Sequence, residues 1–315
     1  MEENKYDVLI VGGGPAGLYT SIMLKKGTPM QVPNENIKVG IIEPNRVGGL
    51  TQYAYIQITK HWAFSGRNLI NTLWNDAKEA EVNFIQEYVV QIDKEKKFFK
   101  VITNQRILKA KYVIIATGIM THPNILDTPE VATIGLHTPE EMINEAVNDH
   151  NWKRVLIAGT DKNSVQDLSK TISKLGKNKL ELVNYYVFDE TVNIQKKNYG
   201  INNNILRKYD GIIFDYNSYK LKNGSTSYFK NLGILQKNGF IKTNSFGETN
   251  VLGIFAVGSV TMPISGIPEA IYSGQVTGLY VGRLLKKTTI AEPSGRFPFF
   301  PRELNWNFSF QHEME

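Results

Sequence analysis

A glycine-rich turn near the N-terminus constrains the fold more than any other feature of this sequence. Residues 12–17 read Gly-Gly-Gly-Pro-Ala-Gly and fit the pattern Gly-x-Gly-x-x-Gly. The apolar, β-branched run 5–11 predicts a buried parallel strand before the turn, and residues 18–26 have a helical pattern after it. A strand, this turn and a helix in succession predict the first unit of a doubly wound α/β sheet.

The glycines of the turn have distinct expected roles. Gly12 makes the tight turn, Gly14 lets the backbone approach a pyrophosphate, and Gly17 lets helix and strand pack closely. The pyrophosphate would lie on free backbone N–H groups at the positive end of the helix dipole. These roles predict a dinucleotide site at the start of the chain.

A carboxylate follows the next predicted strand. Residues 37–42 have a strand pattern that ends at Glu43, and this carboxylate can accept both hydroxyls of an adenosine ribose. The interval between the turn and Glu43 is longer than usual, which we attribute to an inserted loop over residues 27–36. The alternative is a structural glycine turn with a solvated glutamate.

The chain contains no cysteine. Disulfides, thiolate nucleophiles, cysteine-ligated zinc and iron–sulfur clusters are therefore excluded. The five histidines do not have metal-ligand spacing, so no metal site is predicted.

The charge balance is basic, with a net charge of +6 and a pI near 9.1. An acidic partner, nucleic acid or a membrane surface could use such a charge, but no dense basic run stands out. We expect scattered lysines on solvated faces, and no nucleic-acid or membrane partner.

The apolar stretches are far shorter than the roughly 20 residues that span a bilayer. The strand pattern begins at once, leaving no room for a signal peptide, so we expect a cytoplasmic protein.

Three further motifs carry a resemblance to a known family. Residues 47–51 read Val-Gly-Gly-Leu-Thr, the strand 112–115 leads into Ala-Thr-Gly, and residues 249–259 read Thr-Asn-Val-Leu-Gly-Ile-Phe-Ala-Val-Gly-Ser. Together with the first turn, they resemble the small thioredoxin reductases and the ferredoxin–NAD(P) reductases built like them. These are FAD flavoproteins with two dinucleotide-binding domains.

The resemblance implies an α/β fold with two Rossmann-like domains, the second inserted into the first. Residues 1–121 and 246–315 would form the FAD-binding domain, with 288–315 as an aromatic C-terminal tail. Residues 122–245 would form the inserted nicotinamide-type domain. The family also implies a homodimer.

The resemblance assigns cofactor-binding positions and no catalytic side chain. For the pyrophosphate and the adenosine ribose these are Gly12, Gly14, Pro15, Ala16, Gly17 and Glu43. Along the flavin, near the adenine and closing the pocket they are Gly49, Leu50, Thr51, Val89 (through its backbone), Ala116, Thr117 and Gly118. From the C-terminal region they are Gly258, Ser259, Pro268, Glu269 and Ala270.

The C-terminal motif departs from the family at Ser259. The family has an aspartate there that holds the ribityl chain, and a serine hydroxyl makes one hydrogen bond without the charge. We expect a loss of roughly 1–2 kcal/mol of flavin affinity. The helix that follows should begin at Pro268, which suits a first helical position, and point its N-terminus at the flavin pyrimidine.

The second strand–turn–helix unit departs further. The strand pattern 152–158 leads into Gly-Thr-Asp-Lys-Asn-Ser, in which two of three glycines are missing. Asp161 stands where a pyrophosphate should approach, and like charges about 4 Å apart cost roughly 1–4 kcal/mol. The next strand ends in Asp189-Glu190 rather than a basic cluster for a 2′-phosphate. This makes NAD(P)H binding doubtful: NADP(H) is not expected, weak NADH use stays open, and the alternative is a scaffold that binds no nucleotide.

The segment where thioredoxin reductases carry Cys-x-x-Cys reads Ile-Gly-Leu-His-Thr-Pro-Glu-Glu over 134–141. Thr138 and Pro139 predict an N-cap and a first helical residue, with acids in the first turn. His137 is a proton donor or, more simply, a surface or capping histidine. The dithiol mechanism of thioredoxin reduction is ruled out.

Aromatic residues offer two ways to cover the flavin. The tail contains Phe297, Phe299, Phe300, Trp306, Phe308 and Phe310. Such a tail resembles the ferredoxin-reductase branch, where it covers the flavin, or its rings pack on the partner subunit or on the domain's own surface. Tyr53 and Tyr55 are the other candidates for stacking on the ring, and Lys60, His61 and Trp62 for approaching its edge.

We therefore expect an FAD-dependent oxidoreductase that passes electrons through its flavin without redox cysteines. Its partner would be another electron carrier, such as an acidic ferredoxin or flavodoxin, or a small oxidant such as O₂ or a quinone. One alternative is an NADH-dependent ferredoxin or flavodoxin reductase. Another is a non-catalytic FAD-binding interaction protein. A flavin-independent nucleotide-binding protein agrees less well with the first turn and Thr51.

Overall fold

The computed structural model describes residues 4–27, 34, 36–44, 46–59, 62–118, 132–135, 138–187, 207–215, 218, 227–237, 239–261 and 266–286. The strands are β1 (Lys5–Val11), β2 (Val39–Ile42), β3 (Tyr55–Thr59), β4 (Trp62–Ser65), β5 (Asn83–Ile85), β6 (Val89–Lys94), β7 (Phe99–Thr103), β8 (Ile107–Ile115), β9 (Ala132–Gly135), β10 (Arg154–Gly159), β11 (Leu182–Val187), β12 (Gly211–Asp215), β13 (Gln236–Lys237), β14 (Phe240–Ile241) and β15 (Ile254–Ala256).

The helices are α1 (Pro15–Lys26), α2 (Gly66–Glu79), α3 (Pro139–Asn144), α4 (Lys162–Leu175) and α6 (Ile267–Lys286). Short 3₁₀ or π segments are η1 (Gly49–Tyr53), η4 (Glu145–Asp149), η6 (Ser227–Leu232) and η7 (Gly258–Val260). No helix among the described residues is long and apolar enough to cross a bilayer.

The larger sheet has seven strands in the order β5-β2-β1-β8-β7-β6, with β15 also pairing with β8. Strands β5, β2, β1, β8 and β15 run parallel, while β7 runs antiparallel to both of its neighbours, β8 and β6. The β1 run Val8–Val11 is almost fully buried, as its apolar composition predicts. Strands from both ends of the described chain therefore share one sheet, since β15 lies more than a hundred residues beyond β8.

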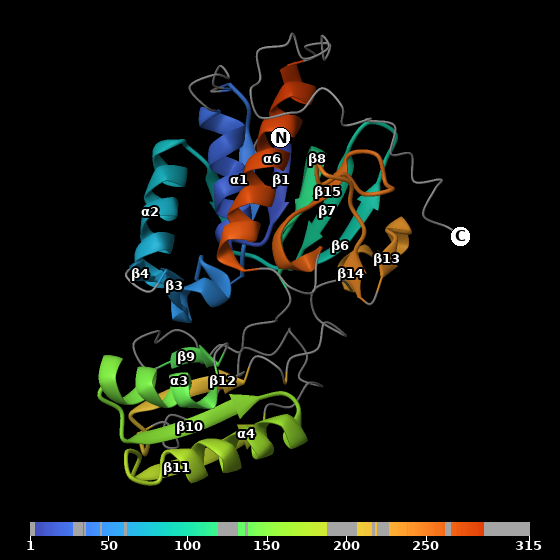
Figure 1. Ribbon diagram of the computed structural model, residues 1–315. Helices are drawn as coiled ribbons and strands as arrows, with labels where there is room; N and C mark the ends of the chain where they lie inside the picture. Colours follow the sequence, from blue (N-terminus) through green and yellow to red (C-terminus); the bar gives the residue numbers. More distant parts are fainter. Residues whose placement is uncertain are drawn as a thin grey trace, which may run out of the picture.

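The larger sheet has a hydrophobic core on each face. Helices α1, α2 and α6 cover one face (Figure 1), where their apolar residues pack on Val8, Ile10 and Ile114. On the other face, residues of β6, β7 and the 229–260 region gather around Val113 and Ile115. Helix α6 approaches α1 closely because its Gly274 and Gly278, which have no side chain, lie against the backbone of α1.

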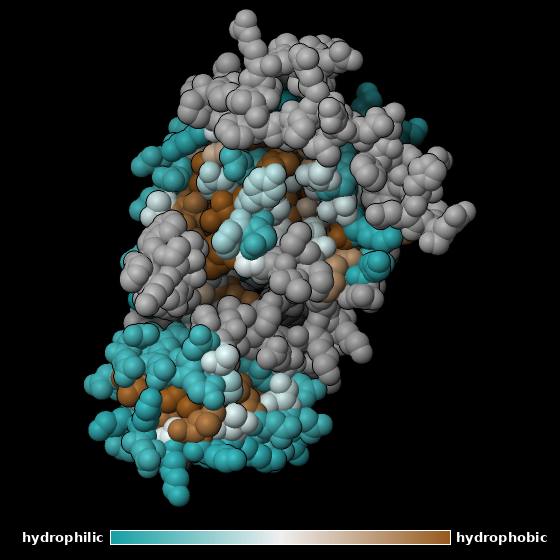
Figure 2. Space-filling model, in the orientation of Figure 1, coloured by the Kyte–Doolittle hydropathy of each residue, from teal (hydrophilic) through white to brown (hydrophobic). Residues whose placement is uncertain are grey.

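The second sheet has four parallel strands in the order β11-β10-β12-β9. It forms the lower body in Figure 1 together with α3 and α4. Val155, Ile157 and Ile213 lie in its core with α4 residues such as Val165 and Ile172. On the face shown in Figure 2, hydrophilic residues cover most of this body, and hydrophobic residues gather in a patch over β10 between α3 and α4.

The expected fold class is confirmed: the molecule is α/β with two strand–turn–helix units, β1–α1 and β10–α4, each belonging to a parallel sheet. The capping signal at Thr138 is confirmed as well. Its hydroxyl accepts from the N–H of Glu141 while the Glu141 carboxylate accepts from the N–H of Thr138, and Pro139 is the first residue of α3. The predicted domain boundaries at 121/122 and 245/246 stay a prediction.

Candidate functional site

The glycine-rich turn lies where the carboxyl ends of the central strands meet. The N–H of Gly12 donates to the Ile42 carbonyl at 2.9 Å, which joins the end of β1 to the end of β2. The N–H of Ala116 donates to the Val11 carbonyl at 2.8 Å, and that of Val257 to the Ile115 carbonyl at 2.9 Å. The ends of β1, β2, β8 and β15 therefore form one edge, the place where ligands of such sheets bind.

Two of the three glycines allow close packing within the turn. Gly12 has φ +112°, and a Cβ there would lie 2.4 Å from the Ala116 carbonyl oxygen. A Cβ on Gly17 would lie 2.1 Å from the Gly12 carbonyl oxygen. Both positions are therefore closed to any larger residue, because these contacts are with backbone that cannot move aside.

The remaining glycine of the pattern faces free space. Gly14 is the N-cap of α1 in an extended conformation, no side chain caps this helix, and a Cβ on Gly14 would meet no atom within 4 Å. Pro15 is the first helical residue, and Ala16 and Gly17 are buried in the first turn. An uncapped helix N-terminus beside an open space matches what a pyrophosphate needs.

Glu43 lies directly after β2, beside this turn. Its carboxylate accepts a 2.9 Å hydrogen bond from the N–H of Gly13, and its own N–H donates to the Ile85 carbonyl at 3.0 Å. The side chain is partly exposed. Its position next to the first turn is the one expected for a ribose-binding carboxylate.

The segment 48–53 is attached to the same turn. The N–H of Gly48 donates to the Gly13 carbonyl at 2.7 Å, and η1 then carries Gly49, Leu50 and the buried Thr51. The first residue of α2, Gly66, packs against η1. A Cβ on Gly66 would lie 1.9 Å from the Thr51 carbonyl oxygen. The predicted flavin-side residues are thus held beside the glycine-rich turn.

The residues after β8 line the same edge. Ala116 is buried against Gly12, and Thr117 and Gly118 are partly exposed. Gly118 has φ +67°, and a Cβ on it would meet no atom within 4 Å. Like Gly14, Gly118 therefore borders open space at the edge of the sheet.

The C-terminal residues approach this edge from the α6 side. The N–H of Gly258 donates to the Ser273 hydroxyl at 3.0 Å, and a Cβ on Gly258 would lie 2.8 Å from the Cβ of Ala16. Ser259 follows in η7 and is partly exposed, and Ala270 is buried nearby. The turn 12–17 and the segment 258–259 are therefore in direct contact.

The expected start of the last helix is wrong by one residue. Helix α6 begins at Ile267, so Pro268 is its second residue rather than its first. Glu269 explains the difference, because its carboxylate accepts from the N–H of Gly266 at 2.8 Å and so ties down the residue before the helix. Pro268 and Glu269 lie at the surface in the first turn of α6.

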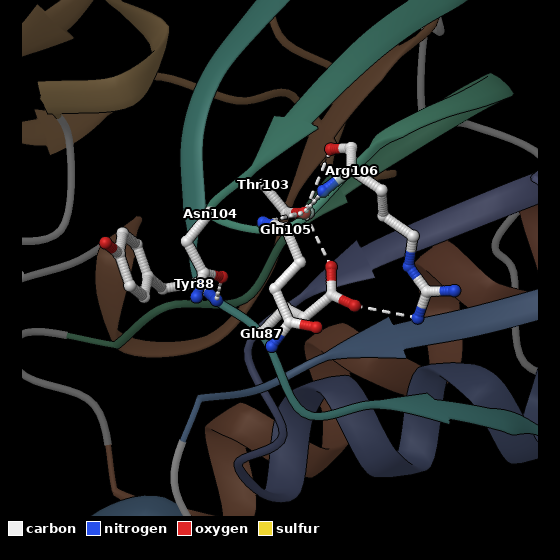
Figure 3. Close-up of polar contacts among 6 residues, drawn as sticks. All are labelled: Glu87, Tyr88, Thr103, Asn104, Gln105 and Arg106. Carbon is white, nitrogen blue, oxygen red and sulfur yellow. Dashed lines mark hydrogen bonds and ion pairs between the residues drawn. The ribbon is translucent and has the colours of Figure 1, made fainter.

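Val89, the predicted neighbour of the adenine, begins β6 and pairs with Thr103. A buried carboxylate lies just before it. Glu87 is 4% exposed, forms an ion pair with Arg106 at 2.7 Å and accepts from the Thr103 hydroxyl at 2.5 Å (Figure 3). The Asn104 side chain accepts from the N–H of Tyr88 at 3.1 Å. These contacts fix the start of β6 on the turn between β7 and β8.

A buried polar contact joins η1 to the second sheet. The Thr133 hydroxyl in β9 lies 3.1 Å from the Tyr53 carbonyl oxygen and 2.5 Å from the Glu145 carboxylate. The ring of Tyr53 is buried and meets Phe214 of β12 edge-on, with centroids 6.4 Å apart. This packing accounts for Tyr53 without the stacking on a flavin that its position suggested.

The second turn, between β10 and α4, is filled by side chains of the protein itself. Asp161 is the N-cap of α4, and its carboxylate accepts from the N–H of Ser164 at 2.9 Å. The Ser164 hydroxyl donates to Asp215 at 2.5 Å, and the N–H of Thr160 donates to the Ser218 hydroxyl at 3.0 Å. This turn does not fit a nicotinamide dinucleotide as the first turn fits a pyrophosphate.

Sequence reasoning does not find Glu87, Ser218 or Ser273. Each contacts a backbone or side-chain group far along the chain, and none belongs to a local pattern.

Several predicted residues lie outside the described part of the chain: Asp189, Glu190, Lys60, His61, His137, the tail 288–315 and the side chains of Tyr55 and Trp62. No group of three or more potential metal ligands occurs in the part of the chain that the structure describes.

The chain is similar to ferredoxin–NADP reductases and to thioredoxin reductases. The chain is similar to a ferredoxin–NADP reductase of Ligilactobacillus salivarius, with 24% identity over 89% of this chain and 88% of the relative. It is also similar to a thioredoxin reductase of Mycoplasmopsis pulmonis, with 25% identity over 91% and 100%. Among solved structures, the thioredoxin reductase of T. acidophilum superposes with a TM-score of 0.55 at 20% identity, covering 90% of this chain and 100% of that one.

The sequence profile of one family matches residues 6–176. The match takes in both strand–turn–helix units, from the start of β1 to the end of α4, and spans more than half of the chain. Although it contains no cysteine, the chain belongs to the pyridine nucleotide-disulphide oxidoreductase family.

Proposed function

We propose that this protein is an FAD-dependent oxidoreductase that exchanges electrons with another electron carrier and uses no cysteine pair. We also propose that residues 1–121 and 246–315 form its FAD domain, with 122–245 inserted. One observation carries the assignment of the cofactor: Gly14 opens onto free space at the uncapped N-terminus of α1, beside a carboxylate that Gly13 already holds.

Different residues at the carboxyl edge of the sheet would contact different parts of the cofactor. The first turn of α1 would hold the pyrophosphate, and Glu43 would accept the hydroxyls of the adenosine ribose. Val89 would meet the adenine through its backbone, at a position that Glu87 and Arg106 fix. Residues 49–51, 116–118 and 258–259 would surround the rest of the group, with Pro268, Glu269 and Ala270 at the pyrimidine end. FAD, when bound, supplies the redox chemistry that the side chains of this chain lack.

The net charge of the chain supports an acidic electron carrier as its partner. The chain has 36 lysines and arginines against 30 aspartates and glutamates, and a basic surface favours encounter with an acidic protein. One similar protein is, by its name, a ferredoxin–NADP reductase. We propose an acidic carrier such as a ferredoxin or flavodoxin. The resemblance to thioredoxin reductases supports a homodimer, which light scattering of the purified protein would test.

The experiment is to purify the protein, record its visible spectrum and titrate apoprotein with FAD and, separately, with FMN. FMN lacks the pyrophosphate and the adenosine, so the contacts of the first turn and Glu43 predict binding of FAD and much weaker binding of FMN. Flavin reduced by dithionite should then be reoxidised by an acidic one-electron carrier, at a rate that falls with added salt. Absence of flavin binding after addition of FAD would overturn the cofactor, and equal binding of FMN would overturn the site.

A further inference from the structure

The second strand–turn–helix unit repeats the first in register. Helix α1 begins three residues after Gly12, and α4 begins three residues after Gly159. Asp161 therefore occupies the N-cap position that Gly14 has in the first unit, and Ser164 the position of Gly17. The two turns can be compared residue by residue.

The N-terminus of α4 is already used by an anion of the protein. The Asp161 carboxylate accepts from the N–H of Ser164 at 2.9 Å, whereas no side chain caps α1 and Gly14 faces free space. A dinucleotide pyrophosphate would have to displace this carboxylate from the helix and approach its negative charge.

A buried serine lies against the end of β10. Ser218 is 0% exposed, accepts from the N–H of Thr160 at 3.0 Å, and is so near Gly159 that a Cβ on that glycine would lie 2.0 Å from its Oγ. In the first unit the matching N–H, that of Gly13, donates instead to Glu43. The group that orients a ribose-binding carboxylate in the first unit thus has another partner in the second.

A second carboxylate lies beside the same helix. Asp215, at the end of β12, is 1% exposed and accepts from the Ser164 hydroxyl at 2.5 Å. The backbone approach that Gly17 permits in the first unit is replaced here by a side-chain hydrogen bond. We propose that the chain's own side chains close the second turn to dinucleotides, so that neither NADH nor NADPH exchanges electrons with this protein. This conclusion does not depend on the proposed FAD site.

Calorimetric titration of the purified protein with NADH, NADPH and ADP tests the closure. Asp161→Gly combined with Ser164→Gly restores the three-glycine pattern, and Asp161→Asn is its matched control, because the amide oxygen still accepts from Ser164 but carries no charge. We expect no saturable binding by the wild-type protein at millimolar ligand. The double variant should bind roughly ten- to a thousandfold more tightly, with Asp161→Asn in between.

Thermal unfolding of each variant checks that it is folded, and its visible spectrum reports the FAD site separately. Micromolar binding of NADH or NADPH by the wild-type protein overturns the proposal. A folded double variant that gains no affinity overturns the assignment of the closure to Asp161 and Ser164. A wild-type protein that binds no FAD would instead contradict the proposed function, and the result for NADH and NADPH at the second turn would still stand.

Discussion

The N–H of Gly13 donates a 2.9 Å hydrogen bond to the carboxylate of Glu43, thirty residues further along the chain. This bond joins the first turn to the residue after β2 and places a negative charge beside the helix N-terminus without capping it. The carboxylate is therefore held in place before any ligand arrives, which lowers the ordering cost of binding.

Replacing Glu43 should weaken FAD binding more than it weakens the fold. Glu43→Gln keeps the shape of the side chain but replaces charge-assisted hydrogen bonds to the ribose by neutral ones, so we expect about a tenfold loss of FAD affinity. Fluorescence titration of apoprotein with FAD measures it. Glu95→Gln, in an exposed turn, is the control. Equal affinities of the two variants would contradict the role of Glu43.

Gly14 and Gly17 separate binding from folding. Gly14→Ala adds a methyl group that meets no protein atom, so the free energy of unfolding of the apoprotein should change by less than about 1 kcal/mol while FAD affinity falls at least tenfold. Gly17→Ala forces a Cβ to within 2.1 Å of the Gly12 carbonyl oxygen and should cost about 1–3 kcal/mol or more. Urea unfolding and FAD titration of both variants give the two quantities. A Gly14→Ala protein that binds FAD normally would show that the pyrophosphate lies elsewhere.

The first unit can be predicted from sequence because its parts are contiguous. The strand, the turn 12–17 and the helix follow one another, and each glycine has a local steric reason. The strand and turn of the second unit can be predicted for the same reason, including the carboxylate of Asp161 in that turn. What Asp161 does there, which is to cap α4, depends on the helix starting at Lys162.

The remaining contacts cannot be predicted, because they join residues that no periodicity relates. Gly258 meets Ser273 only when α6 lies beside η7, and Ser218 meets Thr160 only when β12 lies beside β10. The predicted start of α6 is wrong because proline favours a first helical position, while the Glu269 carboxylate favours Gly266 as the cap. A side-chain contact of this kind outweighs the preference of a single residue.

Glu87 should matter for stability although it belongs to no sequence motif. Its buried carboxylate pairs with Arg106 and accepts from Thr103, so Glu87→Ala removes both contacts, while the Thr103 hydroxyl keeps the Arg106 carbonyl oxygen and the half-exposed guanidinium keeps its water. We expect a loss of about 1–3 kcal/mol in the free energy of unfolding, and a smaller loss for Glu87→Gln, which can still accept from Thr103. Urea unfolding of the two variants tests this order. If both unfold like the wild-type protein, the ion pair adds nothing to the fold.

Asp210 predicts an acid-sensitive contact at the start of β10. Hydrogen bonds from the Arg154 side chain lower the pKa of Asp210 to about 2, with further hydrogen bonds from the backbone N–H groups of Lys153 and Arg154. In the unfolded chain this carboxyl takes up its proton near pH 3.8, before the folded chain does. Stability is therefore present above that pH and is lost as the pH falls toward about 2. Thermal unfolding between about pH 5 and pH 2 should show a steeper loss for the wild-type protein than for Asp210→Asn; parallel curves would contradict it.

Thr133 should determine how firmly η1 is held on the second sheet. Its hydroxyl is within hydrogen-bond distance of the Tyr53 carbonyl and the Glu145 carboxylate, both in a buried setting. Thr133→Val keeps the shape but removes the single hydroxyl proton that these two buried acceptors share, at a cost of about 1–3 kcal/mol. The N–H groups of 49–53 and 132–135 should then exchange with deuterium faster. Thr133→Ser, which keeps the hydroxyl, should exchange as slowly as the wild-type protein. Faster exchange in Thr133→Ser alone, or in neither variant, would mean that the contact with Phe214 holds η1 in place without this hydrogen bond.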